Sequence, residues 1–228
     1  MPGEKVLVID DEEKILSLVS SYLEKEGYSI HTAADGISGL EKALDIKPDI
    51  IVLDIMLPGM DGLEVLAQLR RESDVYVILL TAKTEETDKI VGLSVGADDY
   101  VTKPFSPREL TARVKAAFRR LNAPSQEIDR ETLAFQNLKI NKGSRKVWIK
   151  NQLIDLTAME FDLLTALAEH QGLVLSREQL LEMVWDQDYF GELRVVDVHV
   201  GHIRQKLGDD RYIATVRGVG YRFEDDWE

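Results

Sequence analysis

The sequence contains no cysteine, so disulfide bridges and thiolate metal sites are both excluded. No apolar run approaches the roughly 20 residues that a helix needs to cross a bilayer, and the opening residues lead directly into a predicted strand rather than a secretory leader. We therefore expect a cytoplasmic protein with no membrane partner. Positive charge is also scarce: 28 Lys and Arg face 41 Asp and Glu, a net charge of −13. The chain is thus not a polycation that binds polyanions over its whole surface.

The 228 residues are enough for two domains of about 100 residues each. Up to residue 122, apolar runs of strand length alternate with stretches of helical periodicity. Strands are predicted at 5–9, 28–33, 50–53, 76–80 and 99–102, and helices at 13–26, 36–46, 62–71, 85–95 and 106–121. Five such pairs predict an α/β domain over 1–122, with a flavodoxin-like doubly wound sheet.

The periodicity breaks at 123–131, which we interpret as a linker to a second domain over 132–228. Short strands are predicted there at 133–140, 146–149 and 153–156. Thr157 with Glu160 three residues later forms a capping-box motif for one helix, and Ser176 is the predicted N-cap of the next. A third helix is predicted at 193–207, followed by strands at 212–216 and 221–223 around a glycine-containing hairpin turn.

Five polar side chains in the first domain follow apolar runs typical of buried strands: Asp10, Asp11, Asp54, Thr81 and Lys103. Because ligand chemistry in parallel sheets gathers at the carboxyl ends of the strands, we expect these side chains to converge. Three carboxylates repel one another unless a cation joins them, and hard oxygen ligands with a phosphate oxygen suit Mg²⁺. A lysine opposite them completes a pocket for phosphoryl chemistry.

Each of these residues also has a simpler interpretation when taken alone. Asp10 and Asp11 could cap the helix that begins near residue 12, and Asp54 could be a turn residue before Pro58. Thr81 and Lys103 could be a strand-end hydroxyl and a solvated loop residue. Their joint occurrence at the ends of four apolar strands favours one shared site.

The third helix of the second domain has two distinct faces. Its apolar face contains Val196, Val200, Ile203 and Leu207. The opposite face and its flanks fit a DNA major groove and contain Arg194, Asp197, Val198, Gly201, His202, Arg204 and Gln205. From residue 194 to residue 222 six basic residues (194, 204, 206, 211, 217 and 222) outnumber three acidic ones (197, 209 and 210). A local basic patch on an acidic body predicts weak non-specific affinity and a need for dimerisation.

The motifs of the first domain resemble the receiver domain of two-component response regulators. They are Val8-Ile-Asp10-Asp11-Glu12, Leu53-Asp54, Met56-Leu-Pro-Gly-Met-Asp61-Gly62, Thr81-Ala82 and Asp98-Asp99-Tyr100-Val-Thr-Lys103-Pro104-Phe105. The resemblance implies phosphorylation of Asp54 by a sensor histidine kinase. It also implies a Mg²⁺ cofactor held by Asp10, Asp11, Asp54 and the main-chain carbonyl of Met56. Lys103 would neutralise the phosphoryl charge, and Thr81 and Tyr100 would form the switch.

The second domain resembles the winged-helix DNA-binding domain of the OmpR/PhoB subfamily. The motifs are Leu156-Thr-Ala-Met-Glu160-Phe161, Ser176-Arg-Glu-Gln-Leu, Val195-Val-Asp197-Val-His199-Val and Val216-Arg217-Gly218-Val-Gly220-Tyr221-Arg222. The resemblance implies that the third helix reads promoter DNA, with Arg217 in the minor groove and Arg194, Arg204 and Lys206 on phosphates or bases. The segment 186–192 would contact RNA polymerase.

Two positions depart from that family's common pattern: Gly201 and His202 stand where many relatives carry basic residues. Glycine inside a helix costs about 0.8–1 kcal/mol relative to alanine. Either DNA approaches the helix closely at Gly201, or the glycine is there without a functional reason. A metal site at His199 and His202 is the weaker interpretation, because the sequence offers no third ligand.

The same resemblance implies a homodimer that forms on phosphorylation, through the fourth helix, fifth strand and fifth helix. The residues implied are Lys89, Ile90, Leu93, Asp98, Asp99, Glu109, Ala112, Arg113 and Arg120. We expect Lys89 to pair with Glu109 across a twofold axis, and the two aspartates to pair with the two arginines.

Two other functions are compatible with parts of the sequence. A Mg²⁺-dependent phosphatase would use Asp54 as its nucleophile, but it needs a general acid nearby and leaves the second domain without a role. An orphan regulator would bind DNA without phosphorylation. The chain as a whole predicts a phosphorylation-controlled transcription regulator rather than an enzyme with external substrates.

Overall fold

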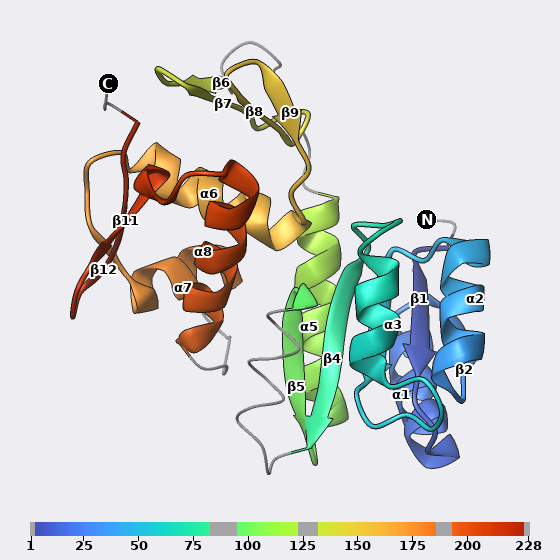
Figure 1. Cartoon of the computed structure of the whole chain (residues 1–228). Helices are drawn as coiled ribbons and strands as arrows, with labels where there is room; N and C mark the ends of the chain where they lie inside the picture. Colours follow the sequence, from blue (N-terminus) through green and yellow to red (C-terminus); the bar gives the residue numbers. More distant parts are fainter. Residues whose placement is uncertain (1–2, 83–94, 123–131, 186–192, 226–228) are drawn as a thin grey trace. The chain divides into compact units, whose positions relative to one another are not determined.

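The computed structural model describes residues 3–82, 95–122, 132–185 and 193–225. The chain divides into two compact units, Met1–Leu121 and Asn122–Glu228 (Figure 1). Three predicted segments lie outside the described residues: the helix at 85–95 apart from Val95, the linker at 123–131 and the loop at 186–192.

The first unit alternates strands and helices as predicted, with these elements in chain order: β1 (Lys5–Ile9), α1 (Glu13–Lys25), β2 (Ser29–Ala33), α2 (Gly36–Ile46), β3 (Ile50–Asp54), α3 (Gly62–Leu69), β4 (Tyr76–Ala82), β5 (Asp99–Lys103) and α5 (Pro107–Leu121). The strands form one parallel sheet in the order β2-β1-β3-β4-β5. α1 packs with α5, and α2 packs with α3. This is the flavodoxin-like fold.

The central strands are apolar on both faces because helices cover the sheet from both sides. All of β3 is buried, as are residues 6–9 of β1. Asp35 and Asp61 fix where two of the covering helices begin: their carboxylates accept hydrogen bonds from the N–H groups of Ser38 (2.9 Å) and Glu64 (2.8 Å). This frame brings the carboxyl ends of β1, β3, β4 and β5 to one edge of the sheet.

The second unit begins with a four-stranded antiparallel sheet, β6 (Thr132–Ala134), β7 (Leu138–Asn141), β8 (Lys146–Ile149) and β9 (Gln152–Ile154). The prediction of one strand over 133–140 is wrong, because β6 and β7 form a hairpin. Asp225 explains the break: its carboxylate accepts hydrogen bonds from the main-chain N–H groups of Asn137 (2.8 Å) and Leu138 (2.9 Å), which turns the chain there.

The rest of the second unit contains helices and a small three-stranded sheet: α6 (Ala158–Glu169), β10 (Leu175–Ser176), α7 (Arg177–Trp185), α8 (Arg194–Leu207), η1 (Asp210–Tyr212), β11 (Ile213–Val216) and β12 (Gly220–Phe223). The sheet order is β10-β12-β11. The predicted capping box is confirmed at Thr157 and Glu160. β10 was not predicted; its approach to β12 requires Gly220, because a Cβ there would lie 1.9 Å from the Leu175 carbonyl oxygen. This half is a winged-helix domain.

The predicted apolar face of α8 is confirmed, since Val196, Val200, Ile203 and Leu207 are all buried. His199 and Val195 are buried beside them, so the core-facing surface of α8 is wider than the sequence predicted. Across the described ranges, no helix has the length and apolarity required to cross a membrane.

Candidate functional site

Three carboxylates lie together at the carboxyl edge of the parallel sheet. Ligand oxygens of Asp10, Asp11 and Asp54 are all within 4.8 Å of one another. Asp10 and Asp54 are buried and Asp11 is exposed. The neighbouring strands β1 and β3 position them, because Ile9 pairs with Leu53 one residue before each buried acid. The predicted convergence of these three residues is therefore what the structure shows.

Lys103 bridges the two buried acids from the end of β5. Its Nζ atom lies 2.7 Å from Asp10 Oδ2 and 3.0 Å from Asp54 Oδ2. Burial alone would lower the pKa of Lys103, but the hydrogen bonds to Asp10 and Asp54 outweigh that effect and raise it. Burial raises the pKa of Asp54, and Lys103 opposes this rise. The lysine is thus held as a cation against the acids.

Two neighbours of this cluster received no role from the sequence. Glu12 lies 3.6 Å from Lys103 Nζ, and its main-chain N–H donates to Asp10 Oδ1 at 2.9 Å. Gly62 packs directly on the strand that carries Asp54, because a Cβ at this glycine would lie 2.0 Å from the Asp54 carbonyl oxygen. Both lie inside motifs quoted above, but only the tertiary contacts show what they do.

Met56 follows Asp54 at the mouth of the pocket. Its main-chain N–H forms a hydrogen bond with the Asp54 carboxylate that lowers the pKa of that acid, while its side chain is exposed. The N–H is suited to an anionic oxygen on Asp54. The metal-ligand role of the Met56 carbonyl stays a prediction.

Thr81 and Tyr100, the predicted switch residues, are both buried. Thr81 lies near the end of β4 next to Asp54, since Asp54 pairs with Leu80. The Thr81 hydroxyl is buried and has no hydrogen-bond partner within the described ranges. A buried hydroxyl without a partner costs free energy, so this group is a ready donor for a new anion in the pocket.

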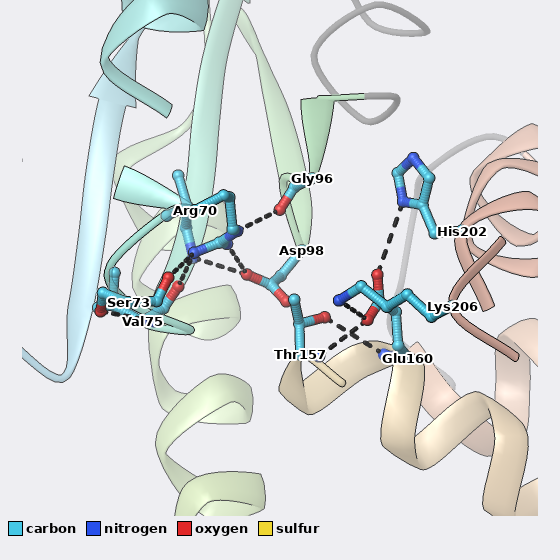
Figure 2. A network of polar contacts seen from close by, with 10 residues as sticks. Arg70, Ser73, Val75, Gly96, Asp98, Thr157, Glu160, His202 and Lys206 are labelled. Atoms are coloured by element: carbon cyan, nitrogen blue, oxygen red, sulfur yellow. Dashed lines mark hydrogen bonds and ion pairs between the residues drawn. The ribbon is translucent and has the colours of Figure 1, made fainter. Parts of the chain in front are cut away.

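Four of the predicted dimer residues have partners inside the single chain: Asp98, Asp99, Glu109 and Arg113. Arg70 Nη2 lies 2.7 Å from Asp98 Oδ2, and this arginine also donates to the carbonyls of Gly96, Ser73 and Val75 (Figure 2). Asp98 is fully buried. A pair between Asp98 and an arginine of a second copy is therefore not available in this conformation, because Arg70 occupies the carboxylate.

Arg113 holds the next acid in the same way. It donates to both carboxylate oxygens of Asp99 at 3.0 Å and to Glu109 at 3.1 Å. Ala112 is exposed on α5 and Arg120 is half-buried. Lys89, Ile90 and Leu93 lie outside the described residues, so their predicted part in the interface stays a prediction.

The outward face of α8 divides into two groups. Arg194, Gly201 and Gln205 are exposed, as is Arg217 at the tip of the β11–β12 hairpin, and Val198 is half-buried. The hairpin turn contains Gly218 at φ +75°, a left-handed conformation that favours glycine. These four exposed positions and Val198 lie open to a groove; Lys206 is exposed too, although its ammonium is paired with Glu160.

The remaining predicted DNA contacts have partners within the chain. Lys206 Nζ lies 2.7 Å from Glu160 Oε2, and His202 Nδ1 lies 3.7 Å from Glu160 Oε1 (Figure 2). Asp197 accepts hydrogen bonds from Arg177 and Tyr221 at 2.6 Å each, and Arg204 binds the main chain of β11. The sequence predicted these four as groove residues because they are polar. Polarity alone does not show whether a side chain faces solvent or binds a partner within the chain.

Within the described ranges the only cluster of three metal-capable side chains is the aspartate cluster. His199 is buried, with Nδ1 3.0 Å from the Val195 carbonyl oxygen and its ring against Trp185. Its position is that of a core residue.

Comparison with known proteins agrees with both halves of the chain. Residues 6–115 match the response regulator receiver domain, and residues 151–223 match the transcriptional regulatory protein C-terminal domain. The alkaline phosphatase synthesis transcriptional regulatory protein PhoP of Bacillus subtilis (strain 168) is 47% identical over 234 residues, covering 98% of each chain.

Two solved structures are similar over almost the whole length. A mutant of RitR has a TM-score of 0.76 at 31% identity, covering 98% of this chain and 100% of that one. DrrB of Thermotoga maritima, an OmpR/PhoB homolog, has a TM-score of 0.51 at 36% identity, with the same coverage. The chain therefore belongs to the OmpR/PhoB family of response regulators, with a receiver domain followed by a DNA-binding transcriptional regulatory domain.

Proposed function

We propose that this response regulator works in the cytoplasm as a phosphorylation-controlled switch on promoter DNA. In this proposal a sensor histidine kinase phosphorylates Asp54, the receiver domain then dimerises, and the paired winged-helix domains bind repeated promoter sites. One observation carries the proposal: the buried Asp54 carboxylate shares the Lys103 ammonium with a second buried acid, Asp10. Among the described residues, this is the one place where three acids that could hold a metal ion meet.

The chemistry asked of Asp54 is phosphoryl transfer. An Asp54 oxygen attacks the phosphorus of the donor, the bond between phosphorus and the kinase histidine nitrogen breaks, and an aspartyl phosphate forms. An ionised carboxylate needs no general base, so positioning and charge stabilisation supply the acceleration. Lys103, already 3.0 Å from Asp54, then follows the new charge to the phosphoryl oxygens.

The donor set fits Mg²⁺. Asp10, Asp11 and Asp54 offer three oxygens within 4.8 Å, and Mg²⁺ prefers one or two carboxylates, a phosphate oxygen and water. We assign Asp11 and Asp54 as direct ligands, Asp10 as a ligand through water, and the Met56 carbonyl as a further ligand. The bound ion would neutralise the phosphoryl oxygens during transfer.

Thr81 and Tyr100 would transmit the change. The Thr81 hydroxyl lacks a partner within the described part of the chain, and a phosphoryl oxygen on Asp54 would supply one. This hydrogen bond would exist only in the phosphorylated state, and such a difference in contacts is what shifts a protein from one conformation to another. Tyr100 on the adjacent strand β5 would then pack into the space that Thr81 leaves.

The active dimer would use the surface of Lys89, Ile90, Leu93, Glu109, Ala112, Arg113 and Arg120, together with Asp99. Because Arg113 already pairs with Asp99 and Glu109 in the single chain, these groups would either share the arginine across the twofold axis or exchange partners on dimerisation. The side chains of Arg113 and Asp99 are only 10% and 5% exposed, so the value of about 0–1 kcal/mol for exposed pairs does not apply to them. We expect the charges of this surface to fix register rather than to supply most of the affinity.

On DNA, α8 would enter the major groove with Arg194, Val198, Gly201 and Gln205 facing the bases or phosphates, and Arg217 would enter the adjacent minor groove. A dimer would cover half-sites about one helical turn apart. The segment 186–192 would contact RNA polymerase.

The pocket is tested by labelling with a small acyl phosphate donor in the presence of Mg²⁺. Asp54→Asn should abolish incorporation, and EDTA should do the same to the unaltered chain. Asp45→Asn, at an exposed acid on α2, is the matched control and should label normally. Normal labelling of Asp54→Asn would show that another carboxylate is the acceptor and would overturn the assignment.

A further inference from the structure

Tyr221 of β12 has a set of polar contacts that the DNA-binding role does not account for. Its hydroxyl donates a hydrogen bond to Asp197 Oδ1 at 2.6 Å. Arg177 Nε donates to the same oxygen at 2.6 Å. The guanidinium carbons of Arg177 and Arg204 lie 5.0 Å and 5.7 Å from the centroid of the Tyr221 ring. The tyrosine, only 5% exposed, is thus in contact with two cations and an acid.

Arg204 makes the second attachment between α8 and the hairpin. Its Nε donates to the main-chain carbonyl of Ile213 at 3.0 Å, and its Nη2 donates to the same carbonyl and, at 2.7 Å, to the Thr215 hydroxyl. One guanidinium therefore holds both the main chain and a side chain of β11.

The two attachments share one geometry. Asp197 and Arg204 are seven residues apart, which is about two turns, so they lie on one face of α8. Thr215 and Tyr221 are directly opposite each other in the β11–β12 ladder, and such residues project from the same face of a hairpin. A single cross-strand pair of the hairpin is thus held against a single face of the helix.

The kind of interaction matters for what this contact can do. Apolar packing tolerates small sliding movements, whereas hydrogen bonds weaken steeply when their angles change, and those to charged groups are the stronger ones. A hairpin attached through four such bonds has a defined angle to the helix. Arg217 lies at the exposed tip of this hairpin, two residues beyond Thr215.

We propose that Asp197, Arg204 and Tyr221 are positioning residues that fix the angle between α8 and the β11–β12 hairpin, and so set where Arg217 meets the DNA relative to the bases read by α8. This inference rests on the proposed function, because it requires α8 and Arg217 to contact DNA. It reassigns Asp197 and Arg204 from direct DNA contact to alignment of the two contacting elements.

A double-mutant cycle separates this role from a purely structural one. The full chain, phosphorylated with an acyl phosphate donor, is titrated with a duplex obtained by selection from random-sequence DNA. Arg217→Ala should weaken binding roughly tenfold in the unaltered chain. It should weaken binding by a clearly smaller factor when Tyr221→Phe has already removed one of the four bonds, because a less firmly aligned hairpin makes a weaker Arg217 contact. Arg194→Ala, on the helix itself, should weaken binding by the same factor in both backgrounds.

The possible results distinguish a failure of the positioning role from a failure of the proposed DNA contact. If Arg217→Ala weakens binding by the same factor with Tyr and with Phe at 221, the positioning role is wrong and the proposed DNA contact stands. If Arg217→Ala and Arg194→Ala both leave binding unchanged in the parent chain, the proposed DNA surface and the inference fall together. Thr215→Val provides a second route at an exposed position should Tyr221→Phe fold poorly: it removes one hydrogen bond to Arg204 and should also reduce the effect of Arg217→Ala.

Discussion

The sequence and the structure indicate different roles for Lys206. The sequence places it on the DNA face of α8, whereas the structure places its ammonium 2.7 Å from Glu160 Oε2. Glu160 also accepts a hydrogen bond from the Thr157 N–H at 2.8 Å, which closes the capping box of α6. Lys206→Met keeps the length of the side chain and removes the charge. We expect it to lower the free energy of unfolding of the second unit.

The magnitude follows from the burial of the two partners. Removing one partner of a fully buried ion pair costs about 3–5 kcal/mol, because the other charge stays buried without compensation. Exposed pairs contribute about 0–1 kcal/mol. The side chain of Glu160 is 3% exposed and that of Lys206 is 34% exposed, and the Thr157 N–H remains in the variant. We therefore expect a loss of about 1–2 kcal/mol, between these limits.

The assay is urea unfolding followed by tryptophan emission. The chain has three tryptophans, and Trp148, Trp185 and Trp227 all belong to the second unit, so the signal does not report on the receiver. Gln205→Met, at the exposed neighbouring position, is the control and should leave the midpoint almost unchanged. On a Glu160→Gln background, Lys206→Met should cost little more. An unchanged midpoint for Lys206→Met, with a salt slope of DNA binding lower by about one, would instead establish a phosphate contact.

Gly201→Ala should stabilise the second unit by about 0.5–1 kcal/mol, since a Cβ there meets nothing within 4 Å. A loss of stability in the urea assay would contradict this. A loss of DNA affinity in the stabilised variant would show that the duplex approaches the helix closely at this position. Burial and then the hydrogen bond to Asp197 raise the pKa of Tyr221 to about 12. Its contribution to stability should therefore be complete below its ordinary pKa near 10 and lost between there and pH 12; ultraviolet titration against Tyr221→Phe checks this, and a phenol that ionises at 10 would oppose it. Thr81→Ala should accept phosphate normally yet gain little DNA affinity on phosphorylation, so a full gain would remove Thr81 from the relay.

The pocket could be predicted from the sequence because each of its residues follows a local strand pattern, and the fold brings the ends of these strands together. Asp10, Asp54 and Lys103 each follow an apolar run, and in a parallel sheet the ends of such runs meet at one edge. Lys103 is 93 and 49 positions away from its two acids in the sequence, but the contact is still predictable because the fold class determines it. The capping box at Thr157 was predictable for the opposite reason: all its parts lie within four residues.

Polar pairs that depend on the packing of separate elements could not be predicted. Lys206 and Glu160 are 46 residues apart on two helices, and only their relative placement decides whether the lysine faces DNA or its own domain. The break in the strand expected at 133–140 has the same cause, because Asp225, 88 residues after Asn137, accepts hydrogen bonds from N–H groups that a continuous strand would have used. A charged residue on a predicted helix is therefore only a weak indicator of a binding face. An apolar residue at a core-facing position is a stronger indicator of the core.

In the proposed function, Asp54 links phosphorylation to DNA binding. The most direct measurement is the affinity of the full chain for a selected duplex, with and without an acyl phosphate donor in Mg²⁺, for the unaltered chain and for Asp54→Asn. We expect the donor to tighten DNA binding by the unaltered chain and to leave binding by Asp54→Asn unchanged. An equal gain in both chains, or no gain in the unaltered chain, would contradict it and favour a regulator that binds DNA without phosphorylation.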